Sequence, residues 1–193
     1  METIRAFIAI ELSTEVKTAV GQLQSRLKPI VPYHAMRWTT PKNIHLTLHF
    51  LGNTPISQIE TIKTVMKQAV QGSTTFLLQV ENVGCFPNLH RPRVVWVGLT
   101  GNVMPLLTLH KKLGQHLARE IDFKVDRRVY SPHLTIGRVK NLLAPPKLRQ
   151  FGQAIERQNA NKLGILPIHG IVLIQSELTP KGPIYTSIAH AEF

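Results

Sequence analysis

The chain of 193 residues has a single cysteine and no long apolar run. The lone Cys85 excludes an internal disulfide framework and a zinc site built from cysteines, and we expect its thiol to lie in the core or near the surface. No stretch approaches the roughly 20 apolar residues that a membrane-spanning helix needs. The apolar run within residues 1–11 is too short for the core of a signal peptide, and no small-residue cleavage site follows it. The sequence therefore predicts a soluble, cytoplasmic protein with no membrane partner.

Several catalytic motifs are absent as well. The chain has no glycine-rich phosphate loop, no serine nucleophile signature and no paired-carboxylate motif. Six of the nine histidines show no ligand spacing with cysteine or acidic residues. These six are His34, His90, His110, His116, His169 and His190. We therefore expect neither a bound metal nor a cofactor.

Acidic residues are also scarce, and the resulting charge is the most informative bulk property. The chain has 23 Lys and Arg against 11 Asp and Glu, which gives a net charge of +12 and a pI near 10.3. Such an excess is typical of proteins that meet polyphosphate. The basic residues are scattered rather than gathered in one tail, so the charge indicates a nucleic-acid partner only in combination with a site.

One short pattern occurs twice. Residues 45–48 read His-Leu-Thr-Leu, and residues 133–136, 88 positions later, read His-Leu-Thr-Ile. Because successive side chains of a strand point to opposite faces, each copy presents one imidazole beside one hydroxyl. With this composition, two or more copies of His-apolar-Thr-apolar arise by chance about 1% of the time. A single copy is typical of a solvent-facing strand, whereas the pair favours a shared site.

Periodicity and chain breakers predict alternating strands and helices. Strands are expected at residues 4–12, 36–39, 44–51, 76–83, 93–99, 123–125, 132–139, 165–177 and 184–193, and helices at 13–28, 57–70, 105–120 and 145–158. This order predicts two similar α+β lobes that face each other, each bringing one motif strand to a shared cleft. No linker or shift in composition separates them, so we expect residues 1–193 to form a single domain.

Two loop assignments accompany this prediction. We interpret Gly52-Asn53 as the end of the first motif strand. Residues 84–92 read Gly-Cys-Phe-Pro-Asn-Leu-His-Arg-Pro. This basic, proline-rich connector is either an ordinary hairpin loop or the rim of a binding cleft.

Five stretches carry a family resemblance that covers essentially the whole chain. They are Arg-Ala-Phe-Ile-Ala-Ile at 5–10, Asn-Ile-His-Leu-Thr-Leu-His-Phe-Leu-Gly at 43–52, Arg-Val-Val-Trp-Val-Gly-Leu at 93–99, Pro-His-Leu-Thr-Ile-Gly-Arg at 132–138 and Gly-Pro-Ile-Tyr at 182–185. With them the sequence resembles the 2H phosphoesterases, and within these the RNA 2′,3′-cyclic phosphodiesterases once called 2′-5′ RNA ligases. The resemblance implies a bilobal α+β fold, with two pseudo-symmetric lobes whose antiparallel sheets flank a central cleft and whose helices lie outside.

The resemblance also implies an activity. The expected enzyme is a metal-independent hydrolase that opens an RNA 2′,3′-cyclic phosphate to a 2′-phosphomonoester and a free 3′-hydroxyl. Only RNA can carry such an end, because it needs a 2′-hydroxyl. From the family, His45 is expected to act as the acid toward the 3′-oxygen and His133 as the base toward water. Imidazole suits both roles near neutral pH.

Further residues are expected around the reacting phosphate. The hydroxyls of Thr47 and Thr135 are placed to donate to its oxygens. Arg138 supplies a planar cation for phosphate or base, and Phe7 either packs under the nucleotide or is a core aromatic. Strict alternation also brings His49 into line with the motif, and we interpret it as a polar residue at the strand end, with RNA contact as the alternative.

Two other functions use the same residues. Ligation of RNA ends through a 2′-5′ linkage would occupy the same site, and a non-catalytic RNA- or nucleotide-binding module is the alternative from another class. The expected partner is RNA with a 2′,3′-cyclic phosphate end, and we expect the chain to be a monomer.

Overall fold

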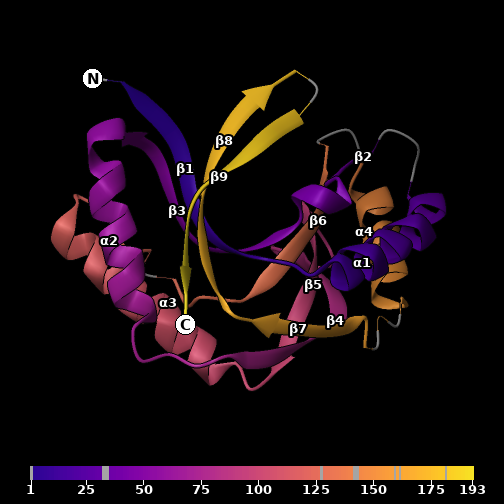
Figure 1. The fold of residues 1–193 in the computed structure, drawn as a ribbon. Helices are drawn as coiled ribbons and strands as arrows, with labels where there is room; N and C mark the ends of the chain where they lie inside the picture. The colour runs from indigo at the N-terminus through magenta and orange to yellow at the C-terminus, as the bar shows by residue number, and fades with distance from the viewer. Residues whose placement is uncertain are drawn as a thin grey trace.

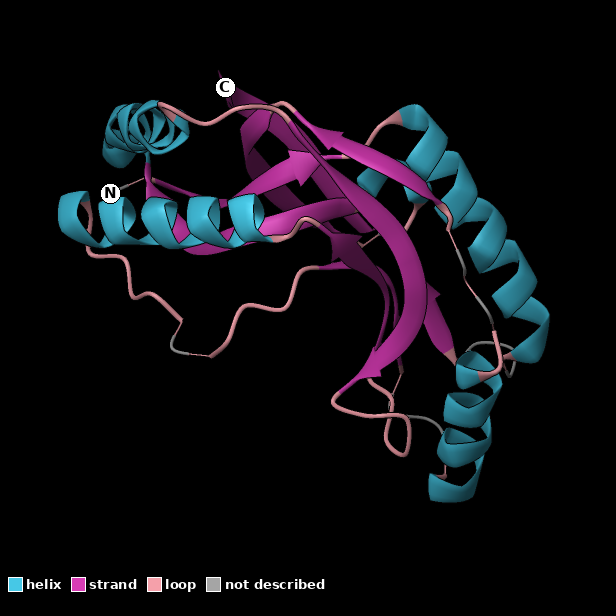
Figure 2. Ribbon diagram, turned by 90° about the horizontal axis from the view of Figure 1, so that it is seen from below, coloured by secondary structure: helices cyan, strands magenta, loops and turns pink. Residues whose placement is uncertain are grey.

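The computed structural model describes residues 2–31, 35–126, 128–140, 144–158, 160, 162–180 and 182–193, which form a curved antiparallel sheet flanked by helices (Figures 1 and 2). Its strands are β1 (Thr3–Glu11), β2 (Met36–Trp38), β3 (His45–Pro55), β4 (Phe76–Phe86), β5 (Val94–Gly101), β6 (His133–Val139), β7 (Gly164–Ile168), β8 (Gly170–Thr179) and β9 (Gly182–Glu192). The helices are α1 (Thr14–Leu27), α2 (Ile59–Val70), α3 (Met104–Glu120) and α4 (Pro145–Glu156), and the 3₁₀ turns are η1 (Lys28–Ile30), η2 (Pro41–Asn43) and η3 (Ile56–Gln58). The predicted α+β class is confirmed.

The strands follow the order β7-β4-β5-β6-β3-β1-β8-β9, and β2 pairs with β6 beside this path. Helices α2 and α3 pack together against the part of the sheet that holds β3, β8 and β9, whereas α1 packs against β7 and α4 against β4. Figure 1 shows these two groups of helices on opposite sides of the view. One lobe therefore contains α2 from the first half of the sequence and α3 from the second half. The other lobe contains α1 from the first half and α4 from the second half.

The two lobes meet where β3 pairs with β6. A single Cα pairing, Leu46 with Leu134, joins these strands. Beyond it the C-terminal half of β6 pairs with β2 instead, from Gly137 opposite Trp38 onward. The motif strands therefore touch at their first residues and then diverge, which opens the concave face of the sheet.

Helix α1 fixes the position of the second motif strand. The side chain of Ser13 caps the helix by accepting a hydrogen bond from the backbone N–H of Val16 at 3.3 Å. Its apolar stripe is buried, and so is Gln24, which is 2% exposed. The amide nitrogen of Gln24 donates to the carbonyls of Thr39 at 2.7 Å and Ile136 at 2.8 Å. A buried amide with both hydrogens bonded orients α1 against β6 without leaving a polar group unpaired.

Two of the predicted strand boundaries are wrong. Strand β3 continues past Gly52 to Pro55, because Gly52 adopts a φ of 73° that only bends the strand. Residues 84–86 belong to β4 rather than to a connector. Gly84 lies opposite Trp96, and a Cβ at this position would come within 2.4 Å of the Trp96 ring. The glycine is therefore a site of close packing, not a turn.

Two further element predictions are wrong. Residues 123–125 form no strand, and the stretch 165–177 is two strands separated at His169. Strand β7 pairs with β4 in one lobe, whereas β8 pairs with β1 in the other, so the chain turns sharply between them. Within the described ranges, no helix is both long and apolar enough to cross a bilayer.

Candidate active site

One cavity on the concave face collects every residue that the sequence analysis singled out for the site. It has a volume of about 380 Å³. Its lining includes Phe7, His45, Thr47, His133, Thr135 and Arg138. These side chains come from β1, β3 and β6, and we call this cavity the cleft.

The register of the two motif strands places their four polar side chains in two pairs, each pair facing across the strands. Because Leu46 lies opposite Leu134 in an antiparallel pair, His45 lies across from Thr135 and Thr47 across from His133. The two leucines point to the other face and are fully buried. Each imidazole therefore has the hydroxyl of its own strand on one side and that of the neighbouring strand on another.

Both imidazoles are held through the same ring nitrogen. His45 Nδ1 lies 2.9 Å from the carbonyl oxygen of Asn43, and His133 Nδ1 lies 2.7 Å from that of Ser131. A carbonyl oxygen only accepts, so Nδ1 carries the hydrogen in each ring. Nε2 remains free to accept a proton in the neutral form and to donate one in the charged form.

His45 lies among aromatic side chains. Its ring is stacked on Phe7 with 4.6 Å between centroids and meets Tyr185 edge-on at 5.3 Å. Desolvation by this packing lowers the pKa of His45, while the Asn43 carbonyl and the Glu11 carboxylate oppose the shift. His45 therefore gives up its proton more readily than a solvent-exposed histidine does.

His133 has a different neighbourhood. Phe86 meets its ring edge-on with centroids 4.9 Å apart, and Trp96 lies beyond Phe86 at 5.3 Å. His133 is half-buried and has no stacked partner like Phe7 among the described residues. The two motif copies thus share their backbone geometry but differ in the packing around the imidazole.

A bulge lies at the last residue of the tetrapeptide in both copies, Leu48 and Ile136, and changes which residues reach the cleft. In β3 the register against β1 shifts between Thr47 and His49, and in β6 the register against β5 shifts between Thr135 and Gly137. Such a shift places two successive residues on the same side. As a result, the residue after the shifted pair faces the cleft, and this residue is Phe50 in β3 and Arg138 in β6.

The prediction that His49 lines up with His45 is therefore wrong. His49 is 5% exposed and points to the opposite face, where its ring is stacked on His110 at 4.2 Å. Its Nε2 lies 2.9 Å from the His110 carbonyl oxygen, which accepts its hydrogen. Burial lowers the pKa of His49. His49 packs β3 against α3 and takes no part in the cleft.

A tyrosine behind the cleft connects the two motif segments. The Tyr130 hydroxyl donates to the carbonyl oxygen of Thr47 at 2.8 Å, and its ring is stacked on His110 at 3.8 Å. Tyr130 lies three residues before His133. It therefore ties the approach to β6 to the backbone of β3.

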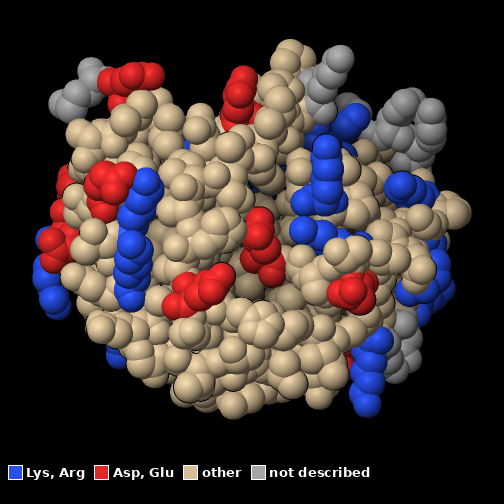
Figure 3. Space-filling view, viewed as in Figure 1, with Lys and Arg blue, Asp and Glu red and all other residues tan. Residues whose placement is uncertain are grey.

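The electrostatic character of the cleft is cationic. Arg5, Arg37 and Arg138 line it, and no Asp or Glu does so among the described residues. Arg5 also lies over the ring of Phe50, with its Cζ 4.5 Å from the ring centroid. In Figure 3 the basic side chains are denser on the right of the molecule, and acidic ones gather on the left and in the middle. The cleft is suited to an anionic ligand.

Several lining residues were missed in the sequence. Phe50 carried no signal because the bulge that turns it inward is invisible in a pattern of strict alternation. Arg5, Tyr185 and Asn43 lay within or beside stretches that carried the family resemblance, but nothing in the residue pattern gave them a place in a site. His34 lies outside the described residues, and in the part of the chain that the structure covers, no three His, Cys, Asp or Glu side chains group as metal ligands.

Two equivalent His-Thr strands that meet on the floor of a cationic cleft define a two-histidine phosphoesterase. The chain belongs to the LigT-like phosphoesterase family, whose model matches twice, at residues 10–96 and 99–185. The two matches correspond to the two halves that the element order predicted, and each contains one motif strand.

Individual relatives are similar over nearly their full length. An RNA 2′,3′-cyclic phosphodiesterase of Methanothermobacter thermautotrophicus is 32% identical over 185 residues, which are 96% of each chain. One of Aquifex aeolicus is 29% identical over 190 residues, 97% of this chain and 96% of the relative. A crystal structure from Thermus thermophilus has a TM-score of 0.79 at 25% identity and 97% coverage of both chains. The fold is thus shared with this family, and the two family matches include both motif strands.

Proposed function

We propose that the chain hydrolyses RNA ends that carry a 2′,3′-cyclic phosphate, and that two histidines act as general acid and general base. The observation that carries this proposal is the meeting of two equivalent His-Thr strands at Leu46 and Leu134, on the floor of one cationic cleft. The names of the similar proteins from Methanothermobacter and Aquifex support the substrate class. The product is a 2′-phosphomonoester beside a free 3′-hydroxyl.

The proposed step is an in-line displacement at phosphorus. Nε2 of neutral His133 takes a proton from the water whose oxygen forms the new bond to phosphorus. Nε2 of protonated His45 gives a proton to the 3′-oxygen as the bond from phosphorus to that oxygen breaks. The lowered pKa of His45 suits the acid role, since its imidazolium is a stronger acid, and the negative phosphate in the cleft favours the charged ring before transfer. Solvent then restores both rings.

The charge that develops on the other phosphate oxygens needs donors in place. Thr47 and Thr135 lie on the same face as the imidazoles, one on each strand, and their hydroxyls are proposed to donate to these oxygens. Arg138 reaches the cleft from the bulge of β6 and is proposed to bind phosphate or base with its planar guanidinium.

Phe7 is proposed to support His45 from below and to meet the nucleotide only at its edge. Its side chain is 3% exposed, and His45 and Tyr185 cover its ring. The sequence-based assignment of Phe7 to substrate binding stays a prediction.

The proposal needs no metal, because the two imidazoles supply proton transfer and the arginines supply positive charge. Each lobe contributes one His-Thr pair to a single cleft, so we also propose that residues 1–193 work as one domain and that one chain is sufficient for activity.

The test is hydrolysis of a short oligoribonucleotide ending in a 2′,3′-cyclic phosphate, in buffer with EDTA, with the product isomer identified. The intact chain is compared with His45→Ala, His133→Ala and, as a matched control, His116→Ala on α3. We expect release of the 2′-phosphate by the intact chain and by His116→Ala, and a loss of about 10²- to 10⁴-fold in each motif variant.

Other outcomes point elsewhere. Turnover that EDTA abolishes would contradict the metal-free mechanism. RNA binding without turnover by a well-folded intact chain would replace the enzyme with a binding module. Formation of a 2′-5′ linkage from a cyclic-phosphate end and a 5′-hydroxyl end, at a rate comparable to hydrolysis, would favour ligation at the same site.

A further inference from the structure

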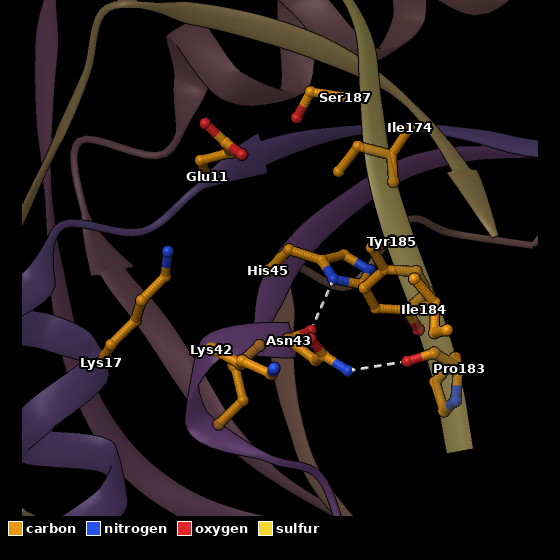
Figure 4. A pocket seen from close by; sticks show the side chains of 11 residues that line it. Glu11, Lys17, Lys42, Asn43, His45, Ile174, Pro183, Ile184, Tyr185 and Ser187 are labelled. Atoms are coloured by element: carbon orange, nitrogen blue, oxygen red, sulfur yellow. Dashed lines mark hydrogen bonds between the residues drawn. The ribbon is translucent and has the colours of Figure 1, made fainter. Parts of the chain in front are cut away.

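A second cavity adjoins the cleft at His45. It has a volume of about 280 Å³. It shares Asn43, His45, Pro183 and Tyr185 with the cleft. The Asn43 side-chain amide donates to the Pro183 carbonyl at 3.0 Å and so bridges the turn before β3 to β9 at the boundary of the two cavities. Figure 4 shows this bridge beside the His45 ring.

Two lysines give the second cavity its character. Lys17 reaches it from α1 and Lys42 from η2, and Ser187 adds a hydroxyl from β9 (Figure 4). Glu11 is the one carboxylate in the lining. Neither lysine forms an ion pair with any residue that the structure describes. Two ammonium groups that no carboxylate pairs with in the described part of the chain, beside a hydroxyl and an amide, are a donor set for a phosphate group.

The cavity is electrostatically linked to the catalytic ring. Glu11 raises the pKa of His45 and Lys17 lowers it, although desolvation has the larger effect. Both charges thus act on the imidazole from the side of the second cavity. A ligand there would lie next to the residue proposed to protonate the leaving oxygen.

We infer that this cavity, here called the Lys17–Lys42 pocket, binds the 5′-phosphate of the terminal nucleotide, which in an RNA chain is the next phosphodiester. The inference rests on the proposed function and adds a specificity to it. The site recognises an RNA end by binding two of its phosphate groups. The cleft holds the cyclic phosphate and the Lys17–Lys42 pocket holds the phosphate before it.

The chemistry of the substrate gives the order of these contacts. The oxygen that His45 protonates is the 3′-oxygen of the terminal ribose, so this ribose lies against His45. The 5′-carbon of the same ribose carries the next phosphate, and the pocket adjoining His45 is where that group can meet two cations. A volume of about 280 Å³ is below the range of about 300–1,000 Å³ usual for drug-sized ligands, which suits a phosphate better than a base.

The test compares three substrates with the intact chain: adenosine 2′,3′-cyclic phosphate, the same compound with a 5′-phosphate, and the dinucleotide ApA with a 2′,3′-cyclic phosphate. We expect kcat/KM to be higher for the two substrates that carry a 5′-phosphate group. We call the ratio of kcat/KM with and without the 5′-phosphate group the advantage. In the double variant Lys17→Ala/Lys42→Ala this advantage should fall by about 5- to 30-fold, as expected for two charge-assisted contacts that are partly exposed. Hydrolysis of the bare nucleoside compound should change far less, since Lys17 is only the smallest of the effects on the pKa of His45.

A matched control removes the same charge elsewhere. Lys67 on α2 and Lys111 on α3 are exposed, so Lys67→Ala/Lys111→Ala lowers the net charge equally without touching the pocket. If this variant loses the advantage to the same extent, the effect comes from the net positive charge of the protein and not from the pocket. The inference is then overturned. An equal loss on all three substrates in Lys17→Ala/Lys42→Ala would overturn it too, since that pattern reports damage to His45.

Glu11 provides a test with the opposite sign. Glu11→Gln removes the one negative charge of the pocket, so it should increase the advantage of the phosphorylated substrates. A smaller advantage in Glu11→Gln would mean that Glu11 accepts a hydrogen bond from a ribose hydroxyl and that no phosphate lies in the pocket. A response to the dinucleotide but not to the 5′-monophosphate would place the second nucleoside, not the phosphate, in the pocket. If the intact chain hydrolyses none of the three, the proposed function fails before this inference is reached.

Discussion

The ring of Phe7 lies flat on the imidazole of His45, with 4.6 Å between the centroids and 26° between the planes. A stacked aromatic pair contributes about 0.5–1.5 kcal/mol beyond its buried area. Phe7→Leu keeps the site apolar but removes the flat support, so the imidazole gains freedom in the proton transfer proposed for it. We expect kcat to fall by about 2- to 10-fold with little change in KM.

The matched control is Phe76→Leu, which removes a ring stacked on Phe193 at 6.0 Å, away from the cleft. It should lower thermal stability without changing kcat. Steady-state kinetics and melting curves of both variants make the comparison. A higher KM at constant kcat in Phe7→Leu would instead assign Phe7 to nucleotide binding.

Tyr130→Phe tests the link between the two motif segments. The change removes the hydroxyl that donates to the Thr47 carbonyl at 2.8 Å. The expected loss is about 1 kcal/mol of unfolding free energy, together with a few-fold lower kcat because Thr47 and His133 lose a fixed spacing. Denaturant unfolding and kinetics measure the two effects.

Tyr185→Phe is the control for stability, since the Tyr185 hydroxyl forms no hydrogen bond within the described part of the chain. It should leave the free energy of unfolding almost unchanged. Equal destabilisation in both variants would show that the bond from Tyr130 to Thr47 contributes nothing particular.

The sequence predicts the centre of this site well because the centre is built from regular strand. Alternation places His45 and Thr47 on one face, and the same holds for His133 and Thr135, so two local patterns were sufficient to foresee four side chains of one cleft. That the two strands are neighbours in one sheet, joined at Leu46 and Leu134, needed the long-range pairing that no local pattern contains.

Prediction failed where the backbone departs from regular alternation. The bulge after Thr47 turns His49 into the core and Phe50 into the cleft. It is defined by the pairing of β3 with β1, so the residues of β3 alone do not reveal it. Gly84 was assigned to a loop because glycine usually marks one, whereas here it makes room for the Trp96 ring. The Lys17–Lys42 pocket was also out of reach, because its two lysines come from a helix and a turn that meet only in the folded chain.

Mild acid should destabilise the fold through its buried histidines. Burial and the neighbouring His49 lower the pKa of His110 to about 4, and burial lowers the pKa values of His45 and His49. The unfolded chain, with histidine pKa values near 6.5, therefore binds more protons than the folded chain between about pH 6.5 and 4. By linkage the stability falls as the pH drops through this window.

The measurement is the melting temperature from pH 7.5 to 4.5. His110→Gln should show a smaller decrease than the intact chain across the window, and His116→Gln on the same helix should follow the intact chain. Asp126 acts at lower pH, since Arg128 holds its pKa at about 2. An equal decrease in intact chain and His110→Gln would show that His110 is not responsible.

Cys85 should be unreactive in the folded protein and can report its unfolding. The side chain is 6% exposed in β4, and burial raises the pKa of the thiol from 9.0 to about 12. At pH 8 the thiolate, which is the reactive form, is then about a thousandfold rarer than for an unperturbed thiol.

We expect an aromatic disulfide reagent to label the native chain only at the rate of opening, and to label it within seconds in denaturant. Because the chain has one cysteine, each labelled molecule has opened at least once, and the rate of labelling measures the rate of opening. Rapid labelling without denaturant would show that β4 opens locally beside β5, since in the folded sheet Cys85 lies opposite Val95.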